Sequence, residues 1–241
     1  MSKILITCKK IKKSTKYIIN EYNRIISLYD EDDIIQKSIC IRCKIENEDY
    51  NKIIKNYFIP ILEIMSNMIN DGIIEWESSI EEVNLNSISK DSNNLSKLIE
   101  ESWERLYIFK SIKYDLTLNF IMHLYINLEK EFLSFINKEY NCDKKTLFSS
   151  LKFIEKKENI IIEKELKNKL NLYRNIINVH KHGKGESFDY ILSNNLNILN
   201  NNGVDGNFSF IFNFKKINIF DLCDAINKLL DLIENQIKIN L

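Results

Sequence analysis

The scarcity of proline and glycine is the feature that most constrains how this chain can fold. Its 241 residues contain one Pro and five Gly. β-Sandwiches and barrels have many tight turns, and those turns draw on both residue types. Hydrophobic residues make up 44% of the chain, which is enough for a buried core and too many for intrinsic disorder. We therefore predict an all-α protein built from long helices.

Apolar residues recur at helical spacing along most of the sequence. This periodicity predicts helices over 45–71 (with a kink near Pro60), 95–141 (one long helix or two nearly collinear ones), 145–157, 159–182 and 218–239. Polar and aromatic residues alternate over 207–214, and that period predicts a short β-strand. We expect a helical bundle over 95–241 and a helical N-terminal extension over 1–94.

Charge is balanced over the whole chain but uneven along it. Lys plus Arg and Asp plus Glu each total 34, so the formal net charge is zero. A neutral chain is a poor candidate for binding nucleic acid by bulk electrostatics alone. Residues 152–184 nevertheless carry nine basic residues and four acids, which predicts a local basic stripe. Residues 1–20 carry six lysines and no acid, and we interpret them as a solvated helix end, with contact to phosphate as the other possibility.

The ends and the cysteines predict a cytoplasmic protein without membrane spans, metal or cofactor. The apolar run near the start is too short for a secretory signal, and no window of about 18 apolar residues exists. Five widely spaced cysteines are expected as reduced thiols. Cys40 and Cys43 form a CxxC pair, but a second such pair and a nearby His are missing from the sequence, so no zinc site is predicted. A Gly-rich nucleotide-binding loop is also missing.

The segment 174–187 concentrates the residues most suited to chemistry. It holds two of the three histidines of the chain, His180 and His182, beside Arg174. Histidine exchanges protons near neutral pH, and the planar guanidinium of arginine matches phosphate oxygens. Cleavage of an RNA phosphodiester without a metal needs one group to move a proton and one to neutralise charge on the phosphorane. The segment therefore predicts phosphate chemistry on RNA.

The same residues resemble the HEPN superfamily. Its motif is an Arg, then a polar residue, then a His after four to six intervening residues, near the end of a helix in a four-helix bundle. Arg174 and Asn175, followed by His180, fit this spacing, and Gly183 ends the helix as in the family. The resemblance covers about residues 95–241.

Family membership implies a metal-independent endoribonuclease that leaves a 2′,3′-cyclic phosphate and works as a homodimer with the two motifs facing each other. Many relatives are toxins or abortive-infection effectors against phage, so an antitoxin or defence partner is expected. Arg174 would bind the scissile phosphate, and His180 or His182 would be the acid and base. The polar residues nearby would orient these groups or guide the RNA: Asn175, Asn178, Lys181 and Lys184.

The helical wheel leaves the choice of histidine open. On an unbroken helix Asn178, Lys181 and His182 fall within about 80° of Arg174, whereas His180 falls about 120° away among apolar residues. Family spacing thus favours His180, and a regular helix favours His182. A distorted helix end after Asn178, or a composite site in a dimer, would reconcile the two.

Two other interpretations also stand. The first is a HEPN-like module that binds RNA, a nucleotide or a partner protein without cutting, as an adaptor in a defence or toxin–antitoxin system. The second is purely structural: Arg174 pairs with a carboxylate on a neighbouring helix, His180 lies in the core, and His182 favours the negative helix end. The remaining histidine, His123, is flanked by apolar residues and is expected in the core.

Overall fold

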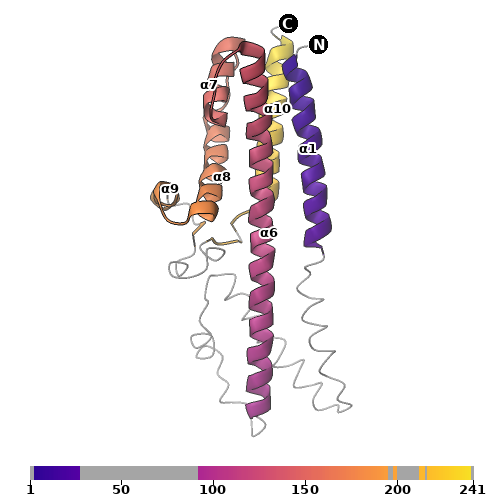
Figure 1. Ribbon diagram of the computed structural model, residues 1–241, viewed down its shortest axis with the longest axis vertical. Coiled ribbons are helices and arrows are strands. Elements are labelled where there is room, and N and C mark those ends of the chain that lie inside the picture. Colours follow the sequence, from indigo (N-terminus) through magenta and orange to yellow (C-terminus); the bar gives the residue numbers. More distant parts are fainter. Residues whose placement is uncertain (1–2, 28–91, 195–197, 200–211, 215, 240–241) are drawn as a thin grey trace. The chain divides into compact units, whose positions relative to one another are not determined.

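A computed structural model describes residues 3–27, 92–194, 198–199, 212–214 and 216–239 (Figure 1). For 92–106 and 109 it describes the backbone alone. Of the described residues 83% are helical and none lies in a strand, so the predicted all-α fold is confirmed. The predicted helix over 45–71 with its kink near Pro60, and the Cys40–Cys43 pair, lie outside the described residues.

Six helices make up the described part of the chain. They are α1 (Lys3–Ile26), α6 (Ser92–Tyr140), α7 (Leu147–Glu158), α8 (Lys164–His182), α9 (Glu186–Ser193) and α10 (Ile219–Ile239). The helices predicted over 95–141, 145–157, 159–182 and 218–239 correspond to α6, α7, α8 and α10. Helix α8 begins five residues later than predicted. Asn159 adopts a left-handed conformation (φ 50°) that ends α7, and an extended connection follows before α8.

The chain divides into two compact units. Unit 1 comprises residues 1–24, 117–195 and 218–241, and unit 2 comprises 25–116 and 196–217. The predicted domain boundary between residues 94 and 95 stays a prediction. Within the described residues, α1 belongs to unit 1 together with α7, α8, α9 and α10.

The basic N-terminal stretch forms α1, whose lysines reach carboxylates on two neighbouring helices. The pairs are Lys3 with Glu139 (2.6 Å), Lys10 with Glu131 (2.7 Å), and Lys12 with Asp231 (2.7 Å) and Glu234 (3.1 Å). Exposed ion pairs stabilise a protein only weakly, but they report the register of the helices. Partner numbers on α6 fall as the lysine numbers rise, so α1 and α6 are antiparallel. The start of α1 and the end of α10 lie together in Figure 1, so this pair is antiparallel as well.

Contacts between α8 and α10 complete an antiparallel four-helix bundle in unit 1. The Gln236 side chain accepts a hydrogen bond from Ile161 N (2.8 Å) and donates one to Ile161 O (2.9 Å), just before α8 begins. Near the other end, the Tyr173 hydroxyl donates to Asn218 O (2.6 Å). The two helices therefore run in opposite directions. Helices α1, α6, α8 and α10 alternate in direction and bury one apolar face each, as in other bundles.

The thiols of the described cysteines are not in disulfides. Cys8, Cys142 and Cys223 are all free. Cys8 is fully buried on α1, and burial, with a smaller contribution from the Glu234 carboxylate, raises the pKa of its thiol to about 12. A thiol with such a pKa is poorly nucleophilic at neutral pH, so Cys8 is a core residue.

The start of α7 is fixed by two side chains. Thr146 is the N-cap and forms a reciprocal capping box with Ser149. Glu129 of α6 accepts a hydrogen bond from Leu147 N (2.9 Å), the first residue of α7. A carboxylate is stabilised at a helix N-terminus by the exposed N–H groups and the helix dipole. These contacts hold the connection before α7, which carries Lys145, against α6.

Unit 2 contains the place where a strand was predicted. Phe212 forms an isolated antiparallel bridge with Leu199, and the Asn213 N–H donates to Ile198 O (2.6 Å). Of the predicted strand 207–214, residues 207–211 lie outside the described part of the chain. Phe214, just after the bridge, stacks on Tyr114 of α6 with ring centroids 3.9 Å apart.

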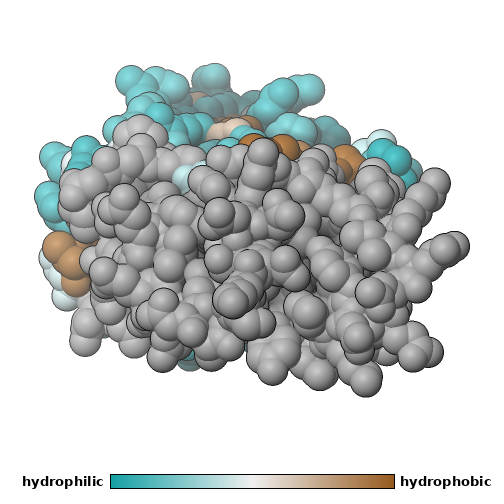
Figure 2. Space-filling model, turned by 90° about the horizontal axis from the view of Figure 1, so that it is seen from below, coloured by the Kyte–Doolittle hydropathy of each residue, from teal (hydrophilic) through white to brown (hydrophobic). Residues whose placement is uncertain are grey.

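Within the described ranges, no helix has the length and hydrophobicity needed to span a bilayer. Figure 2 shows one face of the molecule, on which the coloured residues are mostly hydrophilic with a few hydrophobic ones among them.

Packing of α10 provides a test of the bundle. Leu229 is fully buried on α10, and Leu192 on α9 is 61% exposed. We expect Leu229→Ala to lower the free energy of unfolding by about 2–5 kcal/mol, because it leaves a cavity in the core. The matched change Leu192→Ala should alter it by no more than about 0.5 kcal/mol. Urea unfolding followed by circular dichroism measures both, and equal effects would contradict the bundle.

Candidate functional site

Helix α8 continues without interruption to His182, so its motif residues follow regular helical geometry. Its buried positions form one apolar stripe: Leu166, Leu170, Tyr173, Ile176, Ile177 and Val179. Arg174, Asn178 and Lys181 recur at intervals of four and three residues and therefore share one face, beside that stripe. The distortion after Asn178 that would have reoriented the motif is not present.

This face of α8 opposes α6 across a pocket of about 260 Å³. The pocket is lined from α6, from the connection before α7 and from α8: Tyr125, Ile126, Glu129, Lys145, Thr146, Arg174, Ile177, Asn178 and Lys181. We call it the Arg174 pocket. Of the seven residues proposed from the sequence for binding or catalysis, it brings three together, namely Arg174, Asn178 and Lys181.

The Arg174 pocket carries an excess of positive charge. Of the residues that the structure describes, three cations line it, Lys145, Arg174 and Lys181, against one carboxylate, that of Glu129. Glu129 interacts with the N-terminus of α7 through Leu147 N. No ion pair or side-chain hydrogen bond joins any of the three cations to another described residue. The structural interpretation requires an ion pair between Arg174 and a carboxylate on a neighbouring helix. The described part of the chain contains no such pair.

Tyr125 lines the same pocket, and its hydroxyl is buried. The residue is 3% exposed, and its hydroxyl oxygen is buried without a hydrogen-bond partner among the described residues. Burial raises the pKa of this phenol, the Glu129 charge raises it further, and the Arg174 charge opposes them. The hydroxyl thus lies within electrostatic reach of both charges and stays protonated at neutral pH, as a potential donor. A buried hydroxyl without a hydrogen bond lowers the stability of the fold, so a ligand that accepted a hydrogen bond from it would recover that free energy.

The two imidazoles of the motif do not line the Arg174 pocket. His180 is half-buried with its Nδ1 atom enclosed by protein, in accord with its position within the apolar arc of α8. His182 is exposed, in the last turn of the helix. At a rise of about 1.5 Å per residue, His182 lies about 12 Å along the axis from Arg174, and His180 lies about 9 Å along it on a different face. Within one subunit the pocket therefore contains Arg174 without either imidazole.

The remaining predicted site residues have local roles or are exposed. The Asn175 side chain donates to Asn171 O (2.8 Å), one turn earlier in α8. Asn178 donates to the Ser187 hydroxyl (3.2 Å), which ties α8 to α9. Lys184 is exposed in the turn between these two helices. Helix α9 was not predicted, because two glycines precede it and it is only eight residues long.

The prediction that His123 lies in the core is wrong. It is exposed on α6. The buried residues around it, among them Leu118, Ile121, Tyr125 and Leu128, alternate at spacings of three and four. Residue 123 falls on the opposite face of this stripe, although apolar residues flank it in the sequence.

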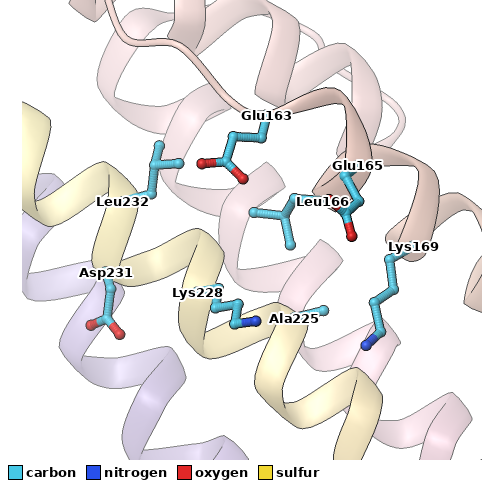
Figure 3. Close-up of a pocket in the computed structure, with 8 residues that line it drawn as sticks. All are labelled: Glu163, Glu165, Leu166, Lys169, Ala225, Lys228, Asp231 and Leu232. Carbon is cyan, nitrogen blue, oxygen red and sulfur yellow. The ribbon is translucent and has the colours of Figure 1, made fainter.

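A second, larger cavity of about 430 Å³ lies between α8 and α10 (Figure 3). Its charged residues have both signs: Glu163, Glu165 and Asp231 against Lys169 and Lys228. Asp231 is also paired with Lys12. Because these charges largely cancel, the cavity has no preference for an anion, and it contains none of the predicted site residues.

The phenol, the carboxylate and one of the cations of the Arg174 pocket were not predicted from the sequence: Tyr125, Glu129 and Lys145. Their positions are 29 to 49 residues from Arg174 along the chain, and no local pattern links them to it. Only the pairing of α6 with α8 brings them together. Among the residues that the structure describes, no group of three or more His, Cys, Asp and Glu has the arrangement needed to hold a metal ion.

No protein-family model, curated protein or solved structure matches the chain. The resemblance to the HEPN superfamily thus rests on the motif over 174–183 and on its place in a helical bundle.

The glycines after α8 offer a test of how this end of the site is built. Gly183 has φ 73° and ψ −144°, a conformation that only glycine adopts readily, whereas Gly185 is extended with open space where a Cβ would lie. We expect Gly183→Ala to cost about 1–3 kcal/mol of stability, and Gly185→Ala to be nearly neutral. Thermal unfolding of the two variants measures this, and equal stability would show that the turn is not fixed by Gly183.

Proposed function

We propose that the chain is a HEPN-like module that binds RNA through a phosphate held in the Arg174 pocket. The observation that carries this proposal is the grouping of Arg174, Lys181 and Lys145 around one pocket without a carboxylate partner among the described residues. Binding without cleavage by a single subunit is favoured, since Arg174 and the imidazoles lie on separate parts of α8.

Phosphate is the anion that best fits this set of side chains. A guanidinium presents a planar fork of donors that matches two phosphate oxygens, and flanking ammonium groups add charge without fixed geometry. A net-neutral protein gains affinity for RNA from such a local cluster and not from its overall charge. The proposal includes action in the cytoplasm and a partner protein such as an antitoxin or another defence component.

A second candidate function is a metal-independent endoribonuclease assembled as a homodimer. The exposure of His182 favours it, because this imidazole is accessible to RNA or to a second copy of the chain. In that arrangement the imidazole of one subunit would serve the phosphate bound by Arg174 of the other. His180, favoured by family spacing, would act in the same way from a dimer seam.

Replacing Arg174 tests phosphate binding. We expect Arg174→Gln to weaken binding of a short single-stranded RNA about tenfold or more, and to lower the slope of log affinity against log salt by about one. Lys228→Gln removes one positive charge from the second cavity and is the matched control, with affinity nearly unchanged. Fluorescence anisotropy over a salt series measures both. If the two variants bind RNA equally well, the Arg174 pocket is not the binding site.

A cleavage assay separates the two candidate functions. If the chain is the binding module, wild-type protein shifts labelled RNA and produces no 2′,3′-cyclic phosphate ends. If it is the dimeric nuclease, cyclic-phosphate ends appear and persist in EDTA. In that case His182→Ala or His180→Ala should lower the rate by about 10²–10⁴-fold and identify the acid/base residue. RNA cleavage that EDTA abolishes would contradict the nuclease candidate.

A further inference from the structure

We infer that the Arg174 pocket binds a terminal phosphate of an RNA strand, a phosphomonoester dianion, in preference to an internal phosphodiester, and that Tyr125 and Lys145 make this distinction. The inference rests on the proposed function, because it names the chemical class of ligand for the same pocket. It concerns two residues to which the motif on α8 assigns no role.

The charge in the pocket matches a dianion. Three cations, Lys145, Arg174 and Lys181, face one carboxylate, that of Glu129, so the formal balance is positive by two. An internal phosphodiester carries one negative charge, whereas a terminal phosphate carries close to two at neutral pH. A monoester therefore balances the pocket, and a diester leaves one cation uncompensated. The second cavity, with charges of both signs, has no such requirement.

The number of donors also fits a terminal phosphate. A diester offers two non-bridging oxygens, and a monoester offers three. The Arg174 guanidinium supplies a fork, Lys145 and Lys181 supply one ammonium each, and Tyr125 supplies a hydroxyl. These donors come from three places in the fold: α6, the connection before α7, and α8. Donors on several sides can surround a terminal phosphate, which is attached to the RNA through one oxygen. They surround an internal phosphate less well, because the RNA backbone continues from it on two sides.

The Tyr125 hydroxyl is the strongest sign that a ligand completes the pocket. Its oxygen is buried in a residue that is only 3% exposed, and it has no hydrogen-bond partner among the described residues. Because burial keeps the phenol protonated, it can donate to an anion. A phosphate oxygen that reached the hydroxyl from the pocket would satisfy it. Glu129, the one carboxylate among the described residues that line the pocket, accepts from Leu147 N at the start of α7.

The experiment compares one RNA sequence with different ends. Anisotropy titrations use the full chain with a short RNA carrying a 5′-phosphate, a 3′-phosphate or hydroxyls at both ends, and with a nucleoside monophosphate as competitor. We expect one phosphorylated form to bind about tenfold more tightly than the hydroxyl form. Tyr125→Phe, which keeps the ring and removes the donor, should abolish most of this preference. Lys145→Gln removes one of the cations that hold any phosphate, so it should weaken binding of all three RNAs and weaken the phosphorylated form most.

Controls separate failure of this inference from failure of the proposed function. Lys228→Gln should keep the full preference for the phosphorylated end, and circular dichroism checks that each variant is folded. If all three RNAs bind equally and Arg174→Gln still weakens their binding, the pocket binds an internal phosphate. The inference is then wrong, and the proposed function stands. If no RNA binds but the nucleoside monophosphate binds in a Tyr125-dependent way, RNA is the wrong ligand and the terminal-phosphate chemistry is supported. If neither binds, both proposals fail.

Discussion

The antiparallel packing of α8 against α6 is the interaction on which the candidate site depends. The apolar stripe of α8 buries six side chains in the bundle, and this burial fixes the rotation of the helix about its own axis. With that rotation fixed, Arg174, Asn178 and Lys181 have to lie at the edge of the stripe, facing α6. The same helix pairing places the Tyr125 hydroxyl and the Glu129 carboxylate opposite them. A different rotation of α8 would bury the cations or disperse them over the surface.

Two smaller features then give the pocket its chemistry. Glu129 accepts the first N–H of α7, and the N-terminus of that helix favours its charge, so this carboxylate has a role other than pairing with Arg174. That same contact holds the connection with Lys145 over the pocket. The result is a site in which positive charge exceeds negative charge, within a protein whose total charge is zero. Local arrangement, and not composition, creates this excess of positive charge.

The separation of Arg174 from the histidines distinguishes the two proposed functions. Regular helical geometry sets their spacing, because α8 is unbroken to His182. His180 faces the protein and His182 faces outward, so neither joins the pocket within one subunit. The proposed phosphate binding therefore involves one copy of the chain. The proposed nuclease would draw its imidazole from a second copy, which is the arrangement that the HEPN resemblance implies.

The sequence by itself determined the helical class and the positions of α6, α7, α8 and α10, and it singled out Arg174 and Lys181 as candidates for binding phosphate, because periodicity and residue type are local properties. It misjudged His123, since apolar neighbours in the sequence say little about the phase of a helical stripe. It also left His180 and His182 as alternatives, because the choice depends on how far α8 stays regular. Only the tertiary structure decided which side chains surround Arg174. Tyr125, Glu129 and Lys145 are distant from it along the chain, and only the burial of apolar faces between helices brings them within reach.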